Sequence, residues 1–200
     1  MYNYGAEYYG IDISKEQIDE AKRISNENGL KIHYQACSAE KTEFPINYFD
    51  SITAVQCFLY FNKEIILPKI HSLLKDNGLF ATVWMAWIPG QSEIAQKTEE
   101  LILKYNPQWQ GCGYQPVKSE VPEWSMPYFK IKTIENYIEE ISFSVDNWLG
   151  RIRACRGVAA ALTEEQVNKF NDEHKKILVS FQKSVLSIPH QILIHVYEKK

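Results

Sequence analysis

The sequence predicts an α/β fold in which helices cover a mostly parallel sheet. Strand-like and helix-like segments alternate through the first half of the chain, as they do in such folds. The 200 residues are 45% hydrophobic, which is enough to build one sizeable core. Apolar and polar residues alternate at positions 191–197 and indicate a closing strand. We therefore expect a single domain over residues 1–200, whose character changes near residue 90.

The first expected elements are a short buried strand ending at Asp12 and a helix that follows at once. Ser14 and Gln17 fit a capping box, and Gly29 fits a left-handed helix stop. Further strands are expected at 31–36, 49–55, 79–84, 128–131, 137–143 and 191–197, and further helices at 63–75, 93–105 and from Thr163 onward. The apolar strand at 49–55 suits a central position in the sheet. Residues 107–124 are rich in proline and lack periodicity, which is typical of a lid or binding loop.

Composition excludes several classes of protein. The net charge of −3 gives no electrostatic case for binding nucleic acid or an anionic membrane. No apolar run approaches the roughly 18 residues of a membrane span, and the polar N-terminus lacks a signal-peptide pattern. The four cysteines are far apart and have no Cys or His at ligand spacing. We therefore expect no metal site and no disulfide, which favours the cytoplasm.

Asp12 is the first candidate functional residue. In nucleotide-binding α/β proteins, a carboxylate at the end of the second strand accepts hydrogen bonds from ribose hydroxyls. The Gly-rich turn of that design lies upstream, yet only six residues precede Glu7, where a strand, turn and helix need about 30. We therefore expect the chain to carry half of a cofactor site. The alternative is that Asp12 only helps to begin the helix.

Four segments in order resemble the class I S-adenosylmethionine-dependent methyltransferases, type 11-like. They are residues 10–14 (second-strand motif), 37–50 (the stretch flanking the adenine), 56–62 (the loop after strand four) and 73–78 (the turn before strand five). The resemblance implies a Rossmann-like three-layer sandwich, N-terminally truncated, with C-terminal helices and antiparallel closing strands. Residues 1–90 would then be a partial cofactor-binding half and residues 91–200 the substrate side.

The resemblance implies S-adenosyl-L-methionine as the cofactor. It assigns cofactor contacts to Asp12, Ile13, Ser38, Ala39, Glu40, Gln56 and Cys57. The family often has Asp where this chain has Ser38, so the adenine contact is weaker here or supplied differently. For Cys57, burial as a packing residue is the alternative.

The truncation carries its own expectation. In the family's sheet, the absent first strand would lie between the strand ending at Asp12 and the strand ending at Val55. Both neighbours would then lack a ladder partner, which invites pairing with another chain. We expect weak cofactor binding and self-association through this gap.

The second half has an arginine cluster, since three of the four arginines fall at 151–156. Arginine is preferred where a planar fork must bind carboxylate or phosphate, so a small anionic acceptor is one interpretation. An internal ion-pair network with Asp146 or Glu164 is the other. The candidate substrate neighbours are Tyr60, Trp87, Trp148, Arg151 and Arg153.

The expected function is methyl transfer from S-adenosyl-L-methionine to a small-molecule acceptor. Holding nucleophile, methyl and leaving sulfur in line can supply much of such catalysis, so no catalytic residue is named. One alternative is a non-catalytic methyltransferase-like remnant or interaction module. Another is a nicotinamide-dependent oxidoreductase, against which the Ala39-Glu40 segment and the aromatic loop after Val55 argue.

Overall fold

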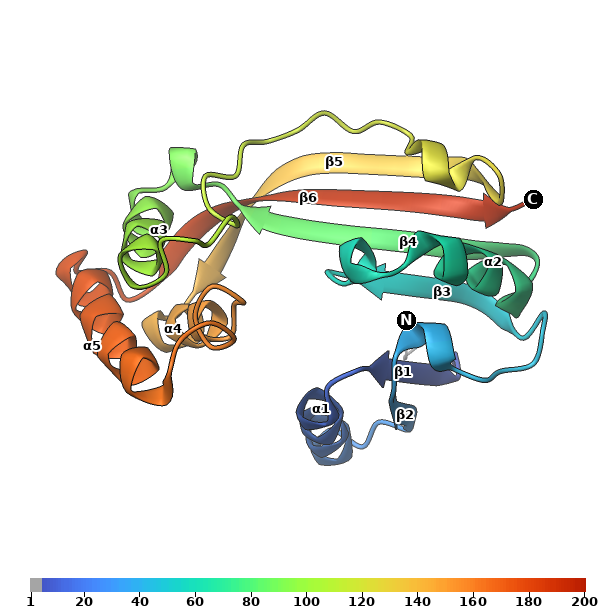
Figure 1. Cartoon of the computed structure of the whole chain (residues 1–200), viewed down its shortest axis with the longest axis horizontal. Helices are drawn as coiled ribbons and strands as arrows, with labels where there is room; N and C mark the ends of the chain where they lie inside the picture. Colours follow the sequence, from blue (N-terminus) through green and yellow to red (C-terminus); the bar gives the residue numbers. More distant parts are fainter. Residues whose placement is uncertain (1–4) are drawn as a thin grey trace. The chain divides into compact units, whose positions relative to one another are not determined.

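The computed structural model describes residues 5–200, and over that range the chain is a mixed α/β structure (Figure 1). The strands are β1 (Tyr8–Asp12), β2 (Ile32–Ala36), β3 (Phe49–Val55), β4 (Leu74–Trp87), β5 (Phe129–Phe143) and β6 (Leu186–Lys199). The helices are α1 (Lys15–Glu27), α2 (Lys63–Leu73), α3 (Glu93–Tyr105), α4 (Val145–Arg153) and α5 (Glu164–Ser180). Short 3-10 helices are η2 (Ala39–Lys41), η3 (Phe58–Tyr60), η4 (Pro89–Gln91) and η5 (Glu123–Ser125).

The strands form two sheets, one of β1 and β2 and one in the order β3-β4-β6-β5. β1 and β2 are parallel, with Tyr8 opposite Ile32 and Asp12 opposite Ala36. In Figure 1 the arrows of β3 and β4 point the same way and that of β6 points against them. The expected antiparallel closing strand is therefore confirmed, and it is longer than the 191–197 segment that predicted it.

The position of β3 differs from the prediction. Its bounds agree with the expected strand, but it is the edge strand of its sheet, and not a central one. β1 likewise pairs with β2 alone, so one edge of β1 and one edge of β3 have no ladder partner within residues 5–200. Val55, at the end of β3, is 57% exposed. Because β4 pairs with only one edge of β3, the backbone groups along the other edge have no ladder partner within residues 5–200.

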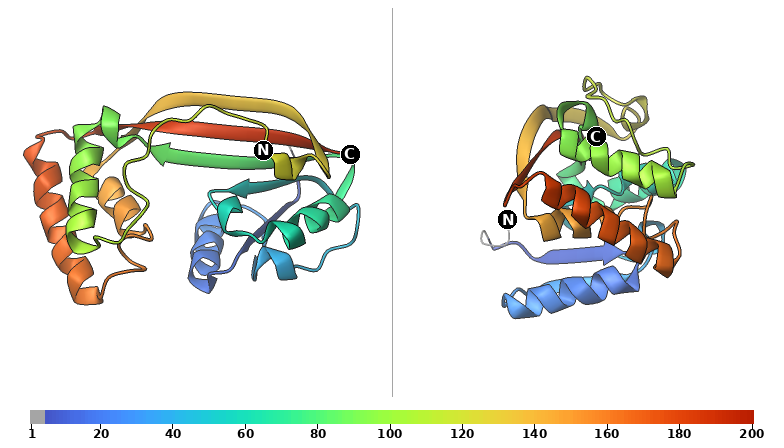
Figure 2. Two further views of the ribbon diagram at one scale, coloured as in Figure 1. Left: turned by 45° about the horizontal axis from the view of Figure 1, so that its top comes forward. Right: turned by 90° about the vertical axis from the view of Figure 1, so that its left-hand side faces the viewer.

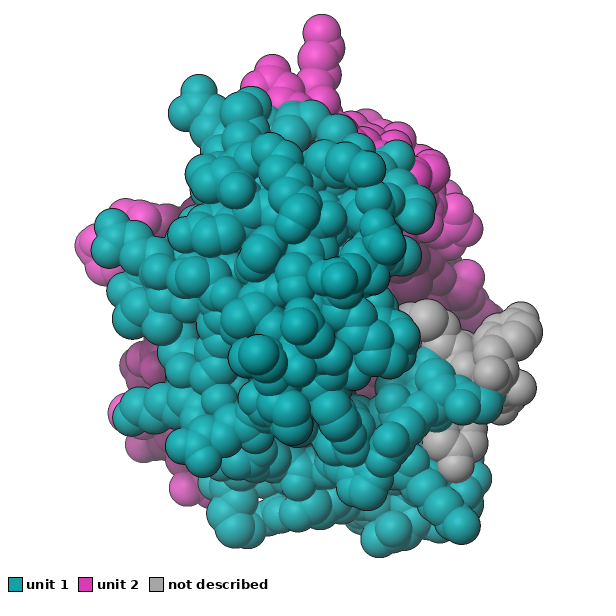
Figure 3. Space-filling view, turned by 90° about the vertical axis from the view of Figure 1, so that its right-hand side faces the viewer, with its two compact units in different colours: residues 1–82, 121–132, 196–200 teal, residues 83–120, 133–195 magenta. Residues whose placement is uncertain are grey.

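The residues divide into two compact units, which Figure 3 colours separately. The first contains Met1–Thr82, Val121–Lys132 and Val196–Lys200, and the second contains Val83–Glu120 and Thr133–His195. Because β4, β5 and β6 have residues in both, each unit is made of segments distant in sequence.

Local signals in the first unit act near their predicted positions. The Ser14 hydroxyl accepts a hydrogen bond from the Gln17 amide at 3.2 Å and caps α1, which is one half of the predicted capping box. Gly29 has φ +64° just after the end of the helix, as predicted. Figure 2 shows α1 beside β1 and β2, and its Ile18 is buried. At Gly10 a Cβ would lie 2.7 Å from the Tyr34 ring, so only glycine lets β1 approach that ring.

α2 supplies the core of the first unit. Asn62 accepts from the Glu64 amide at 3.1 Å and caps the helix, and buried aliphatic side chains follow on one face. The core comprises Ala54, Ile66, Leu67, Ile70, Leu74, Phe80, Phe129 and Tyr197. The helix ends at Leu73, before the expected Asn77-Gly78 stop, which lies within β4 instead. Asn77 has φ +61°, so the left-handed turn is present but belongs to the strand.

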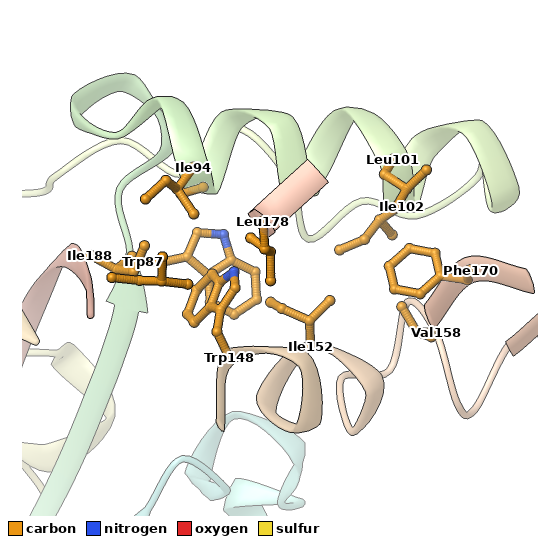
Figure 4. Close-up of a cluster of buried hydrophobic side chains, with 12 residues drawn as sticks. Trp87, Ile94, Leu101, Ile102, Trp148, Ile152, Val158, Phe170, Leu178 and Ile188 are labelled. Carbon is orange, nitrogen blue, oxygen red and sulfur yellow. The ribbon is translucent and has the colours of Figure 1, made fainter. Parts of the chain in front are cut away.

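The core of the second unit is formed by α3, α4, α5 and the neighbouring ends of β4 and β6 (Figure 4). α5 begins with the complete capping box predicted for Thr163 and Gln166. Two features were missed: α4 was not predicted, and β5 is one continuous strand instead of two. The expected loop after α3 is confirmed, because residues 106–122 contain no helix or strand.

Candidate functional site

Asp12 ends β1 and has one carboxylate oxygen in use. Its Oδ1 accepts a hydrogen bond from the Ser14 amide at 2.8 Å, and its carbonyl accepts one from the Cys37 amide at 2.9 Å. Asp12 therefore helps to begin α1, as the alternative interpretation stated. The side chain is nevertheless exposed, and its Oδ2 has no hydrogen bond to residues 5–200. Ile13, the next residue, is 79% exposed, so an open carboxylate oxygen stands beside an uncovered aliphatic side chain.

The segment from Ser38 to Glu40 follows β2 and is tied into its own loop. The Ser38 hydroxyl donates to Glu40 Oε2, and the Asn62 amide donates to Glu40 Oε1 at 3.3 Å. The Ser38 hydrogen bond, with smaller help from the backbone and from Lys69, lowers the pKa of Glu40. The Ser38 hydroxyl and the Glu40 carboxylate therefore shape η2, which contains Ala39.

Gln56 and Cys57 follow β3. Gln56 has φ +59°, a conformation that residues other than glycine seldom adopt and that clusters at functional sites. Burial, and then the charge of Asp12, raise the pKa of the Cys57 thiol. Cys57 also packs against the core of the first unit, so the packing role that the sequence left open is real.

Two contacts align β1 with β3 although the strands do not pair. The Tyr9 ring lies 5.6 Å from the Phe49 ring at the beginnings of these strands. At their ends, the Asp12 charge acts on Cys57. β1 and β3 therefore run in the same direction, and β2 is parallel to β1. Asp12, residues 38–40 and residues 56–57 accordingly lie at one end of three strands, which is the edge where open α/β sheets bind ligands.

The candidate substrate residues fall in different settings. In the first unit, Tyr60 is 55% exposed in η3. In the second, the Arg151 guanidinium lies 5.2 Å from the Trp87 ring centroid, on its face, and Arg153 is exposed two positions along α4. Trp148 is fully buried, with its indole enclosed in the core. Neither of these two arginines has an ion pair to a carboxylate within residues 5–200, so neither takes part in the predicted network with Asp146 or Glu164.

Sequence reasoning missed Glu99 and Trp109 in the second unit. Glu99 is only 5% exposed, and its two oxygens accept hydrogen bonds from Trp87 Nε1 and from the Gly113 amide, both at 2.7 Å. The available signal was a charged residue on the buried face of α3. Trp109 lies 6.4 Å from the Trp87 ring, and a Cβ on Gly111 would come within 2.7 Å of its indole.

Residues 5–200 contain neither a metal-binding cluster nor a membrane-spanning helix. Within that range, no three or more His, Cys, Asp or Glu side chains are grouped so that they could hold a metal ion. No helix there is long and apolar enough to cross a membrane.

Known proteins resemble this chain in part of its sequence and in its fold. Residues 1–82 match the family described as "Methyltransferase domain". A Bacillus halodurans protein described as a methyltransferase shares the fold with a TM-score of 0.55 and 14% identity, over 96% of this chain and 83% of that one. The family match thus covers 82 of the 200 residues, and the solved structure shows a shared fold.

Two further solved structures show how widely the fold is used. Geranyl diphosphate methyltransferase in complex with S-adenosylmethionine has a TM-score of 0.50 and 14% identity, over 98% of this chain and 70% of that one. The [4+2]-cyclase SpnF has a TM-score of 0.51 and 15% identity, over 96% of this chain and 66% of that one. No curated protein sequence matches significantly. At these identities the likeness concerns the fold.

Proposed function

We propose that this chain transfers a methyl group from S-adenosyl-L-methionine to a small-molecule acceptor. The observation that carries the proposal is the gathering of Asp12, residues 38–40 and residues 56–57 at one end of β1, β2 and β3, inside the segment that matches the methyltransferase family. The resemblance to the methyltransferases assigns each of these groups to the cofactor.

The residues present fit the cofactor. The open Oδ2 of Asp12 can accept a hydrogen bond from a ribose hydroxyl while Oδ1 keeps the Ser14 amide. Ile13 offers aliphatic surface beside it. The hydrogen bonds within residues 38–40 hold the backbone of Ala39 in one conformation, as an adenine contact requires. The bound cofactor would supply an electrophilic methyl group, and the chain's task is to orient it.

Binding of S-adenosylhomocysteine to Asp12→Asn tests the proposal. Asparagine keeps an oxygen for the Ser14 amide and the helix start, but it loses the charge that a ribose hydroxyl would address. We expect the binding free energy to weaken by about 1–3 kcal/mol, the range for hydrogen bonds to a charged group. Isothermal titration calorimetry measures the change.

Asp76→Asn is the matched control, because the Asp76 side chain is 93% exposed in the same unit and belongs to the beginning of β4, whereas Asp12 ends β1. Its affinity should equal that of the unmodified chain. Equal affinity for Asp12→Asn, with an unchanged circular dichroism spectrum, would remove Asp12 from the cofactor site. Titration with NAD in the same experiment addresses the oxidoreductase alternative, for which NAD and not S-adenosylhomocysteine would bind.

A non-catalytic role is the alternative, because the fold alone does not fix the reaction: one similar structure is described as a [4+2]-cyclase. A radiolabelled methyl donor incubated with candidate acceptors separates the two. Transfer of the label supports methyl transfer, and cofactor binding without any transfer supports a binding or interaction module.

We also propose that the chain associates with itself through the unpaired edges of β1 and β3. Three apolar side chains on these strands and just beyond are exposed, namely Ile11 at 39%, Ile13 at 79% and Val55 at 57%. Unpaired backbone groups beside apolar surface favour strand pairing between chains. A cytoplasmic location stays a prediction.

A further inference from the structure

Arg151 is a half-buried cation without a counter-ion. It belongs to α4, and its guanidinium lies over the Trp87 ring at 5.2 Å. Within residues 5–200 it has no hydrogen bond and no ion pair. Burial lowers the pKa of this guanidinium, although arginine stays charged in proteins. A charge removed from water is costly unless it is paired, so a partner that is absent from the chain would stabilise this arrangement.

The neighbouring titratable groups do not neutralise Arg151. Burial raises the pKa of the Cys155 thiol, so at neutral pH it is not a thiolate. Burial, and then the charge of Arg151, lower the pKa of His190. His190 Nδ1 donates to the Ile188 carbonyl at 2.8 Å, and with its lowered pKa the imidazole is neutral at pH 7. The Glu99 carboxylate binds the edge of the Trp87 ring, but both of its oxygens accept hydrogen bonds from other groups. Within residues 5–200, no carboxylate is therefore ion-paired with the Arg151 guanidinium.

We propose that Arg151, held on the face of Trp87, binds the carboxylate of a small carboxylic acid in the second unit. A guanidinium fork matches the two oxygens of a carboxylate. A single positive charge balances a carboxylate and leaves a phosphate dianion half compensated. The stacking on Trp87 fixes the plane of the fork, which favours two-point over one-point binding.

Three probes that share one ring and differ only in the head group test this selectivity. Benzoate carries the carboxylate, phenyl phosphate carries a dianion and benzyl alcohol is neutral. Because the guanidinium lies on Trp87, binding should change tryptophan fluorescence, and calorimetry at low salt gives the affinity. We expect benzoate to bind most tightly of the three.

Variants of α4 then locate the site. Arg151→Gln should weaken benzoate binding at least tenfold, and Arg151→Lys should give an intermediate loss because lysine keeps the charge but not the fork. Lys175→Gln is the control, since Lys175 is an exposed cation on α5 of the same unit. It should change benzoate affinity less than twofold.

Several results would overturn the inference: unchanged benzoate affinity in Arg151→Gln, an equal loss in Lys175→Gln, or preferential binding of phenyl phosphate. Circular dichroism and the melting temperature establish whether each variant is folded. If Arg151→Gln does not fold, the benzoate affinity of Arg151→Lys tests the inference instead. S-adenosylhomocysteine affinity is measured in parallel. If the chain binds benzoate but not S-adenosylhomocysteine, the proposed function alone is contradicted. If it binds S-adenosylhomocysteine but not benzoate, only this inference is contradicted.

Discussion

The two units treat their polar side chains in opposite ways. In the first, Asp12 uses one oxygen for the backbone and leaves the other open at an exposed strand end. In the second, Thr98, Glu99, His174 and Gln191 are all at most 5% exposed and bond to other protein groups. Buried polar groups need hydrogen-bond partners within the protein. An exposed polar atom without such a partner binds water or a ligand instead. The contrast separates polar residues that hold the fold from those that a ligand can use.

Thr98→Val should break the buried network most severely. The Thr98 hydroxyl accepts from Trp148 Nε1 at 3.1 Å and lies 3.0 Å from His174 Nε2. Valine has nearly the same shape but no oxygen, so both ring nitrogens lose their partner. We expect the free energy of unfolding in urea to fall by about 2–4 kcal/mol, because each buried group left unpaired costs about 1–3 kcal/mol.

Thr53→Val makes the same chemical change on the exposed side of β3 in the first unit. Its unfolding free energy should differ from that of the unmodified chain by less than about 0.5 kcal/mol. Equal losses in the two variants would show that the buried network carries no special stability.

Acidification should act on the second unit through His174. Burial lowers the pKa of this fully buried imidazole from 6.5 to about 4. The unfolded chain therefore binds the proton first, so this stabilisation is complete above pH 6.5 and is lost as pH falls towards 4. The difference corresponds to about 3 kcal/mol. Urea unfolding between pH 7 and pH 4 measures the loss.

His174→Gln isolates this contribution, because other groups also titrate in that range. Glutamine can still donate to Thr98 but takes up no proton. The variant should lose less stability than the unmodified chain over the same pH interval. If the unfolding free energies of His174→Gln and of the unmodified chain fall equally over this pH interval, other groups cause the acid sensitivity.

The smallest effect on stability is expected at the open edge of the first unit. Val55→Lys places a charge at the unpaired edge of β3, where Val55 is 57% exposed, so the fold should change by less than about 0.5 kcal/mol. An edge lysine opposes strand pairing between chains. Sedimentation velocity should show less association than in the unmodified chain. If the unmodified chain is already monomeric at the same concentration, the proposed self-association is wrong.

The sequence predicts local features well because their causes are local. Ser14, Gly29 and Thr163 act on amides or dihedral angles within a few residues, and the structure confirms each. The edge position of β3 depends on which strands lie beside it, and no pattern within residues 49–55 contains that information.

The candidate sites show the same limit. The cofactor residues follow strand ends and could be named from motifs, whereas Arg151 was found only through the scarcity of arginine. Arg151 lacks a charged neighbour in Cys155 and His190 because both of these groups are neutral. Their neutrality follows from burial, and burial is set by packing. Glu99 shows this even more clearly, because its partner amide at Gly113 belongs to a loop without periodicity.

The loop at residues 106–120 contains two amides whose hydrogens are protected from exchange with solvent. Within residues 106–120, which contain no helix or strand, the Gly113 amide donates to Glu99 and the Val117 amide donates to Gln191 at 2.9 Å. Gln191 also donates to the Val117 carbonyl at 2.7 Å and is 3% exposed. Amides held by buried side chains exchange only when that part of the protein opens. A segment without helix or strand therefore carries protected amide hydrogens at two positions, and Tyr114 between them is also bonded to Gln191.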